Sequence, residues 1–240
     1  GEFFGLGTDD PPDDMLCRLC KAARSDCKFI SLDSRTCQKI FMMCSSEDRR
    51  SFRGVCKDWR LNSLAATRRV TIENQNLAVV EHLVGALDRA TSLSLYCFSR
   101  SIAENVSPCV KELRIFRTVK PTLFKKIPKA ENITSLALMD CGVSDKLVIS
   151  IFEKQVLFPA LKKLDLSSCS VKGEFLSYLP HTVETLILKC STLDDKYLKF
   201  TKESELKELD LSHTPITKLA TIPQSVQVLC LAYTKVDRDE

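Results

Sequence analysis

The sequence predicts an α/β solenoid, in which about eight short parallel strands stack into one curved sheet behind a helical N-terminal module. Three observations predict it. One aliphatic pattern recurs through the last two thirds of the 240-residue chain, its copies are spaced almost evenly, and two amphipathic helical patterns precede it. A repeat period of about 20 to 50 residues indicates a stacked array, because each unit buries its apolar edge only against its neighbours.

The recurring pattern places aliphatic residues at the first, fourth and sixth positions of each repeat. Its clearest copies are Leu161-Lys-Lys-Leu164-Asp-Leu166 and Leu206-Lys-Glu-Leu209-Asp-Leu211. The eight copies begin at positions 67, 90, 110, 133, 161, 183, 206 and 226, although Thr67 and Ala90 are weaker at the first position. All sixteen residues at offsets +3 and +5 from these starts are aliphatic. This alternation predicts one strand per repeat, with its aliphatic side chains inside the solenoid.

A second set of positions extends the pattern in five of the repeats. Three positions after the last aliphatic residue stand small polar or thiol residues, and two positions further on stand apolar residues. The small residues are Cys141, Cys169, Ser191, Thr214 and Thr234, and the apolar ones are Val143, Val171, Leu193, Ile216 and Val236. The whole pattern resembles the leucine-rich-repeat consensus, with Cys or Thr in the usual place of Asn or Cys. We expect the small polar group to bond to the backbone where the chain turns away. The returning half should carry short helices such as 144–152, with Ser144 as a candidate N-cap.

Two amphipathic helices are predicted between residues 31 and 61. In each helix four apolar residues stand at i, i+3, i+4 and i+7, which is one helical face. The faces consist of Cys37, Ile40, Phe41 and Cys44 in the first helix, and of Phe52, Val55, Cys56 and Trp59 in the second. An earlier stretch, 13–23, shows a further apolar face. The predicted domains are an N-terminal segment with a possible helix over 1–30, a helical module over 31–62, and the repeats over 63–240.

The helical module resembles an F-box. The resemblance covers about 30 residues: Leu32, then Ile40-Phe41 eight positions later, then Asp48, and a closing Val55-Cys56-Lys57-Asp58-Trp59. The sequence departs from the family pattern where Asp33 replaces a proline and where Cys44 and Arg49 replace leucines. Leucine-rich repeats are the most frequent companion of an F-box, so the chain as a whole is similar to F-box proteins with leucine-rich repeats.

This resemblance implies a substrate-recognition subunit of an SCF-type cullin-RING ubiquitin ligase. The F-box would bind the Skp adaptor, which bridges to a cullin, and the repeats would hold a protein substrate. The residues implied to contact the adaptor or to form the module's core are Leu32, Ile40, Phe41, Phe52, Val55 and Trp59. Such a receptor has no catalytic residues and works by raising the local concentration of substrate lysines. The resemblance implies a cytoplasmic or nuclear location.

The helical module could bind an adaptor or could only cover the first repeat. A solenoid needs a cover for its first apolar edge, and a pair of amphipathic helices would provide one without binding any adaptor. The chain would then be a leucine-rich-repeat scaffold that assembles a complex without ubiquitin.

The sequence ends at Glu240, just after the eighth predicted strand, so either the last repeat is covered in an unusual way or the chain is part of something longer.

One candidate partner site lies on the concave face, which we define as the sheet face carrying offsets +2, +4 and +6. Side chains at these offsets alternate away from the core. At offset +6, Tyr96, Phe116 and Met139 should be lateral neighbours, with Arg114 close by at offset +4. Aromatic residues, Met and Arg are enriched where proteins bind proteins. The alternative is that the N-terminal segment or a loop covers these early strands.

Composition argues against several other functions. The net charge of +4 and the scattered basic residues do not indicate a nucleic-acid binder. No apolar run reaches the roughly 20 residues of a membrane span. The 12 cysteines, many at apolar positions, suggest buried thiols in a reducing compartment, and we expect no zinc at Cys17, Cys20, Cys27 and Cys37. No cofactor motif is present, and we expect Asp165 and Asp210 to be solvated or to contact a partner rather than to catalyse.

Overall fold

A computed structural model of the chain describes the predicted repeats from residue 68 onward. The described residues are 68–73, 77–85, 87–117, 120–140, 142–153, 157–219 and 222–236. The predicted N-terminal segment 1–30 and the helical module 31–62 lie outside these residues. The implied adaptor-binding residues Leu32, Ile40, Phe41, Phe52, Val55 and Trp59 therefore lie outside them as well.

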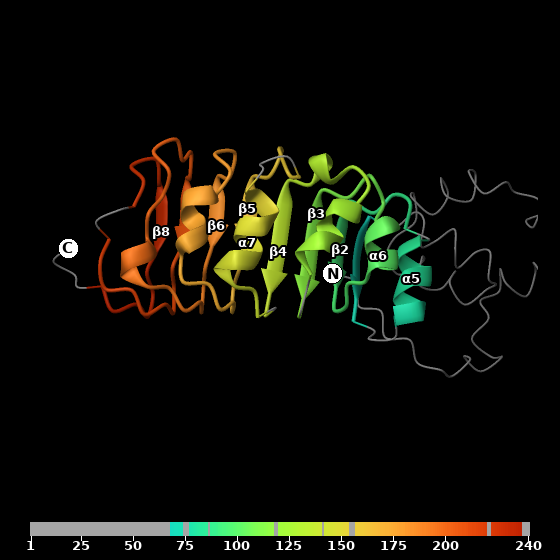
Figure 1. The fold of residues 1–240 in the computed structure, drawn as a ribbon, viewed down its shortest axis with the longest axis horizontal. Helices are drawn as coiled ribbons and strands as arrows, with labels where there is room; N and C mark the ends of the chain where they lie inside the picture. Colours follow the sequence, from blue (N-terminus) through green and yellow to red (C-terminus); the bar gives the residue numbers. More distant parts are fainter. Residues whose placement is uncertain are drawn as a thin grey trace, which may run out of the picture.

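Eight parallel strands form one sheet, in which every strand pairs with the next strand of the sequence. The strands are β1 (Arg69–Ile72), β2 (Ser92–Leu95), β3 (Glu112–Phe116), β4 (Ser135–Met139), β5 (Lys163–Asp165), β6 (Thr185–Ile187), β7 (Glu208–Asp210) and β8 (Val228–Cys230). Figure 1 shows them side by side along the long axis of the molecule. Each strand begins at offset +2 of its repeat, which confirms the prediction of one strand per repeat.

The sheet keeps one register from end to end. Paired residues always have equal offsets, as in Leu93 with Leu113 and Leu136 with Leu164. From β1 to β7, the aliphatic residues at offsets +3 and +5 are at most 4% exposed and form the core. They are Val70, Ile72, Leu93, Leu95, Leu113, Ile115, Leu136, Leu138, Leu164, Leu166, Leu186, Leu188, Leu209 and Leu211. An unbroken register is expected here, because a one-residue slip would turn every aliphatic side chain out of the core.

A backbone ladder at offset +1 ties each repeat to the next. The carbonyl of Lys162 accepts two hydrogen bonds, from the backbone N–H of Glu184 at 2.8 Å and from that of Thr185 at 2.9 Å. The same pair of bonds is made by the carbonyls of Arg68, Thr91, Lys111, Thr134, Glu184 and Lys207. Backbone hydrogen bonds therefore fix the start of each strand, and they do not depend on the side chain at offset +1.

The returning halves of the repeats carry short helices on one side of the sheet (Figure 1). They are α5 (Leu77–Gly85), α6 (Arg100–Glu104), α7 (Asp145–Phe152) and the 3₁₀ turns η3 (Pro121–Lys126), η4 (Ala130–Asn132), η5 (Glu174–Tyr178) and η6 (Asp195–Tyr197). Successive segments contact one another from α5 through α6, η3 and α7 to η5. Beneath them, Phe124 lies 5.9 Å from both Phe98 and Phe158, measured between ring centroids. This aromatic cluster fills the core between the sheet and the helices.

The helix predicted over 144–152 is present as α7, but its start is built differently from the prediction. Ser144 occupies the N-cap position, yet its side chain makes no capping hydrogen bond. The next residue, Asp145, is 6% exposed and bonds to the following repeat. Its carboxylate accepts the backbone N–H groups of Lys172 at 2.7 Å, Gly173 at 2.9 Å and Phe175 at 3.2 Å.

Asp195 makes an equivalent connection two repeats further on. It stands at offset +12, as Asp145 does, and its carboxylate accepts the backbone N–H of Thr217 at 2.9 Å and the Thr217 hydroxyl at 2.6 Å. Burial acts to raise the pKa of Asp195, but the hydrogen bonds from Thr217 and the charge of Lys218 outweigh it and lower that pKa. Aspartates thus link neighbouring repeats on the side of the solenoid that carries the helices.

The small polar residues that follow the strands bond to backbone, as predicted. The hydroxyls of Ser191, Thr214 and Thr234 donate to the carbonyls of Leu188, Leu211 and Leu231 at 2.6, 2.6 and 2.8 Å. The buried Cys169 thiol donates at 2.9 Å to the carbonyl of Leu138, in the preceding repeat. Cys141 lies outside the described residues. Each bond satisfies a carbonyl that the turn leaves without a partner in the sheet.

The last strand differs from the other seven in its exposure. Val228 is 52% exposed, and Leu229 is 36% exposed although the aliphatic residue at its offset is buried in every earlier repeat. Cys230 is exposed as well. Within the described residues, β8 is therefore an open edge of the sheet.

Candidate functional site

The concave face is built from rows of residues that share an offset. Because the register never slips, residues at one offset on successive strands become lateral neighbours, about 4.8 Å apart. The pairs Ser94 with Arg114, Arg114 with Ala137, and Phe116 with Met139 follow directly from the strand pairing. The predicted neighbourhood of the four candidate residues is therefore present.

Tyr96, Phe116 and Met139 form a row at offset +6, which we call the aromatic row. The rings of Tyr96 and Phe116 stack with their centroids 4.5 Å apart and an angle of 16° between their planes. Phe116 is the register partner of Met139. All three side chains are half-buried, so part of each remains accessible to solvent. The row joins a rigid stacked pair to a flexible thioether, which adapts well to an apolar partner.

Arg114 lies beside the aromatic row in the middle of β3. Its lateral neighbours are small: Ser94 is 8% exposed and Ala137 is 4% exposed, while Arg114 itself is exposed. In the described part of the chain, no carboxylate lies within ion-pair distance of its guanidinium. Arg114 is thus an exposed cation that is flanked by two small side chains and lies next to the aromatic row.

A row of left-handed backbone conformations follows the strands at offset +7. Six successive repeats place a non-glycine residue there with φ between 51° and 76°: Arg117, Asp140, Ser168, Cys190, His213 and Tyr233. In this row the backbone N–H donates to a carbonyl of the next strand, as from Ser168 to Lys189 at 2.8 Å and from His213 to Ala232 at 2.8 Å. The exposed rings of His213 and Tyr233 stack with their centroids 4.4 Å apart. The row forms the rim of the concave face at the ends of the strands.

The acids Asp165 and Asp210 hold turns, which differs from the expectation that they are solvated or contact a partner. The Asp165 carboxylate accepts the backbone N–H of Ser167 at 3.0 Å and its hydroxyl at 2.6 Å. Asp210 accepts the backbone N–H of Ser212 at 2.9 Å. Both are half-buried and stand two strands apart on β5 and β7. They fix the end of each strand, and nothing in their geometry suggests acid–base work.

A shallow groove of about 170 Å³ lies on the concave face over β5 to β8. Ile187 and Val228 give it apolar walls, and Lys163, Glu208 and Asp210 give it charges of both signs. This half of the concave face is more polar and more acidic than the half that carries the aromatic row.

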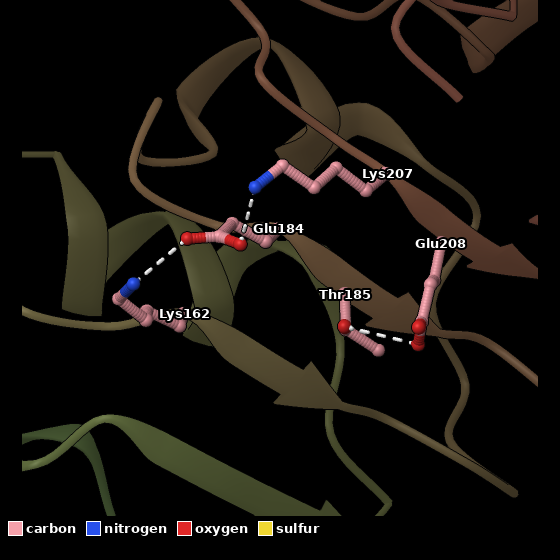
Figure 2. Close-up of polar contacts among 5 residues, drawn as sticks. All are labelled: Lys162, Glu184, Thr185, Lys207 and Glu208. Carbon is pink, nitrogen blue, oxygen red and sulfur yellow. Dashed lines mark hydrogen bonds and ion pairs between the residues drawn. The ribbon is translucent and has the colours of Figure 1, made fainter. Parts of the chain in front are cut away.

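A chain of charges crosses the entrance of the sheet at offset +1, and the sequence patterns did not reveal it. Glu184 accepts hydrogen bonds from Lys207 at 2.7 Å and from Lys162 at 2.9 Å, one lysine on each neighbouring repeat (Figure 2). These bonds, and the positive charge of the two lysines, lower the Glu184 pKa from 4.5 to about 2. Beside this chain, the Thr185 hydroxyl donates to Glu208 at 3.2 Å. The sequence does contain the pattern that could have predicted it, because Lys162, Glu184 and Lys207 alternate in charge at offset +1.

The five described cysteines are thiols rather than disulfides, and most of them are not in the core. Only Cys169 is buried, while Cys109, Cys190 and Cys230 are exposed, so one of the five described cysteines is a core thiol of the kind expected for many of them. Burial, and secondarily the charge of Glu81, raises the pKa of the Cys97 thiol. Among the described residues no three His, Cys, Asp or Glu side chains gather as metal ligands. The cysteines at positions 17, 20, 27 and 37 lie outside the described residues.

Comparisons with known proteins identify similar folds only. No protein-family profile matches the chain, and no curated protein matches it either. Among solved structures, the leucine-rich-repeat domain of APL1B is 16% identical over 69% of this chain, with a TM-score of 0.42. TLR13, solved in its complex with ssRNA13, is 12% identical over 75% of this chain, with a TM-score of 0.37. The matches span 53% and 38% of those two chains.

The fold assignment therefore depends on the topology itself. Eight parallel strands in sequential order, one per repeat, with short helices on the return, form a leucine-rich-repeat solenoid. No helix among the described residues is long and apolar enough to cross a membrane.

Proposed function

We propose that this chain is a non-catalytic receptor that binds another protein on its concave face. The observation that carries the proposal is the aromatic row: two stacked rings and a methionine stay partly exposed on a rigid sheet, beside the exposed Arg114. Aromatic and Arg side chains dominate the energetics of protein interfaces, and rigid presentation lowers the entropy lost on binding. The substrate-binding residues under this proposal are Tyr96, Phe116, Met139 and Arg114.

The more specific form of the proposal is a substrate receptor of an SCF-type ubiquitin ligase. Its support is the F-box-like sequence over 31–62, with Ile40-Phe41 and the closing Val55-Cys56-Lys57-Asp58-Trp59. This segment would bind the Skp adaptor and through it a cullin, in the cytoplasm or nucleus. The ligase would supply the chemistry, and the repeats would supply the choice of substrate.

Co-purification with the Skp adaptor tests the ligase form of the proposal. The full chain and a Phe41→Ala, Trp59→Ala double variant are compared, after circular dichroism shows that both are folded. Stoichiometric binding by the wild type that is lost in the variant supports a receptor of the SCF type. A well-folded wild type that binds no adaptor excludes it, and the chain is then a leucine-rich-repeat scaffold.

A charge placed in the aromatic row tests the binding face independently. Phe116→Asp should abolish the capture of a specific partner, while Ala232→Asp, at the same offset in the last repeat, should preserve it. Quantitative mass spectrometry of proteins bound to each tagged variant gives the comparison. Thermal melts of both variants are the control, because a Phe116→Asp variant that no longer unfolds cooperatively would show Phe116 to be part of the core.

A further inference from the structure

The two halves of the concave face differ in the charged and apolar side chains that they present. On β2 to β4 it presents the aromatic row, the exposed Arg114 and one half-buried acid, Glu112, and on β5 to β8 it presents Asp165, Glu208 and Asp210. Lys163 and Lys189 partly balance those acids. Among the described ion pairs Arg114 has none, so it is the cation on the β2 to β4 half that is available to an acidic ligand, whereas acids outnumber lysines on the β5 to β8 half.

We propose that the partner presents an extended segment in which an acidic residue and an apolar residue alternate. The carboxylate would bind Arg114, and the apolar side chain would pack against the aromatic row. The proposal rests on the proposed function, because it assumes that the concave face binds a protein. It adds the chemistry of the segment that is recognised.

The space around Arg114 favours such a segment. Its lateral neighbours at offset +4 are Ser94 and Ala137, and the neighbouring strands carry Ser92 and Ser135 at offset +2. These short side chains leave room on both sides of the guanidinium. An incoming carboxylate could therefore approach in the plane of the guanidinium and accept two parallel hydrogen bonds, which is the strongest pairing that Arg offers.

The distance between Arg114 and the aromatic row sets the spacing of the ligand. Arg114 and Phe116 are two residues apart on one strand, which separates their Cα atoms by roughly 6.6 Å. An extended segment that runs along β3 places its own residues i and i+2 at the same distance and on the same face. One acidic and one apolar side chain at alternate positions therefore meet Arg114 and the aromatic row together.

A carboxylate fits this position better than a phosphate does. Recognition of phosphorylated or strongly acidic motifs generally uses a cluster of arginines. The acids nearest to Arg114 on this face are Glu112, two residues before it on β3, and Asp165, two strands away, and both would repel a second negative charge.

Selection from a phage-displayed library of random peptides on the immobilised full chain tests the proposal. The most enriched peptide is then synthesised with its acidic residue intact and with that residue replaced by the corresponding amide. Fluorescence anisotropy measures the affinity of both peptides for the wild type, Arg114→Ala, Phe116→Ala and Lys189→Ala. The last variant removes one positive charge from the acidic half of the same face and serves as the matched control.

We expect the enriched peptides to share an acidic and an apolar residue at alternate positions. Arg114→Ala, Phe116→Ala and the amide peptide should each weaken binding at least about tenfold, and Lys189→Ala should not. Combining Arg114→Ala with the amide peptide should cost no more than either change alone, since both remove the same contact. These outcomes support the proposal.

Two other outcomes overturn it, and they are distinguishable. If binding is lost in Phe116→Ala but unaffected by Arg114→Ala and by the amide peptide, the concave face binds a partner but does not recognise a carboxylate. If no peptide is enriched, or if neither Arg114→Ala nor Phe116→Ala affects the enriched peptide, the extended acidic segment is wrong. The separate comparison of Phe116→Asp with Ala232→Asp then decides whether the proposed function also fails.

Discussion

Asp145 in the fourth repeat accepts the backbone N–H of Gly173 in the fifth at 2.9 Å, across 28 positions of sequence. The same carboxylate also binds the backbone N–H groups of Lys172 and Phe175, so a single side chain satisfies three donors of the next repeat. Buried donors that lose their acceptor cost free energy. This carboxylate therefore contributes to stability although it has no cationic partner among the contacts described.

Asp145→Ala should lower the free energy of unfolding by about 3 kcal/mol, because it leaves buried N–H donors without an acceptor. Asp145→Asn should cost less, since its amide oxygen still accepts. Chemical denaturation followed by circular dichroism measures both. Glu174→Ala, an exposed acid in the neighbouring turn η5, is the control and should change little. A wild-type stability in Asp145→Ala would contradict the role given to this carboxylate.

Glu184 should make the stability of the solenoid sensitive to acid. Its pKa in the folded protein is about 2, below the ordinary value of 4.5, because Lys207 and Lys162 bind its charged form. A lowered pKa gives stabilisation that is complete above about pH 4.5 and is lost as the pH falls towards 2. Glu184→Gln should therefore flatten the fall of melting temperature between those two values.

The same variant should also respond less to salt, because the two ion pairs are exposed and salt screens them. Melting curves recorded against pH and against sodium chloride concentration measure both effects. Glu203→Gln removes an exposed acid that forms no ion pair in the described part of the chain, and it should retain the wild-type profile. An unchanged acid profile in Glu184→Gln would show that the Lys162–Glu184–Lys207 chain does not persist in solution.

Ser168→Gly should raise the free energy of unfolding, by up to about 1 kcal/mol. Ser168 has a φ of 58°, and a left-handed conformation strains every residue that carries a Cβ atom. Glycine relieves that strain, although it loses more entropy on folding. Ser168→Val should destabilise, because a branched side chain tolerates this conformation worst. Thermal melts should rank the three proteins in the order Gly, Ser, Val, and any other order would contradict the backbone geometry at offset +7.

Phe124→Ala should cost about 3 to 5 kcal/mol, the usual range for removing a fully buried aromatic side chain. The Phe124 ring is 0% exposed and touches Phe98 on one side and Phe158 on the other. Phe124→Leu should cost less, since it leaves a smaller cavity. Guanidinium titrations measure both, and Leu123→Ala, a half-buried neighbour, is the comparison. A similar cost for Phe124→Ala and Leu123→Ala would place the cluster outside the cooperative core.

The strands could be predicted from sequence because their signal is repeated. Leu93, Leu113 and Leu136 each obey the same local rule, and pairing in register follows once the rule holds on every strand. The positions of Tyr96, Phe116 and Met139 followed from the same offsets. Each copy of the pattern is weak evidence by itself, but eight copies together predict the arrangement of the sheet and of its concave face.

The returning halves could not be predicted in the same detail, because each has its own length and composition. The 3₁₀ turn η3 begins at Pro121 and shows no helical periodicity, and Ser144 looked like a capping residue while Asp145 makes the decisive bonds. Residue type alone does not locate Cys109, Cys190 and Cys230, which are exposed although cysteine is among the residues most often buried. A search for Asp at offset +12 would have found both aspartates that link the repeats.

The exposure of β8 implies that this strand opens more readily than the strands in the middle of the sheet. Each repeat is held only by its neighbours, and Val228–Cys230 has a neighbour on one side only, among the strands described. Amide protons there should exchange with solvent through local fraying, whereas those of β4 should await opening of several repeats. The aromatic row on β2 to β4 would then keep its shape while β8 opens locally. Local opening of β8 would thus leave the proposed recognition surface intact.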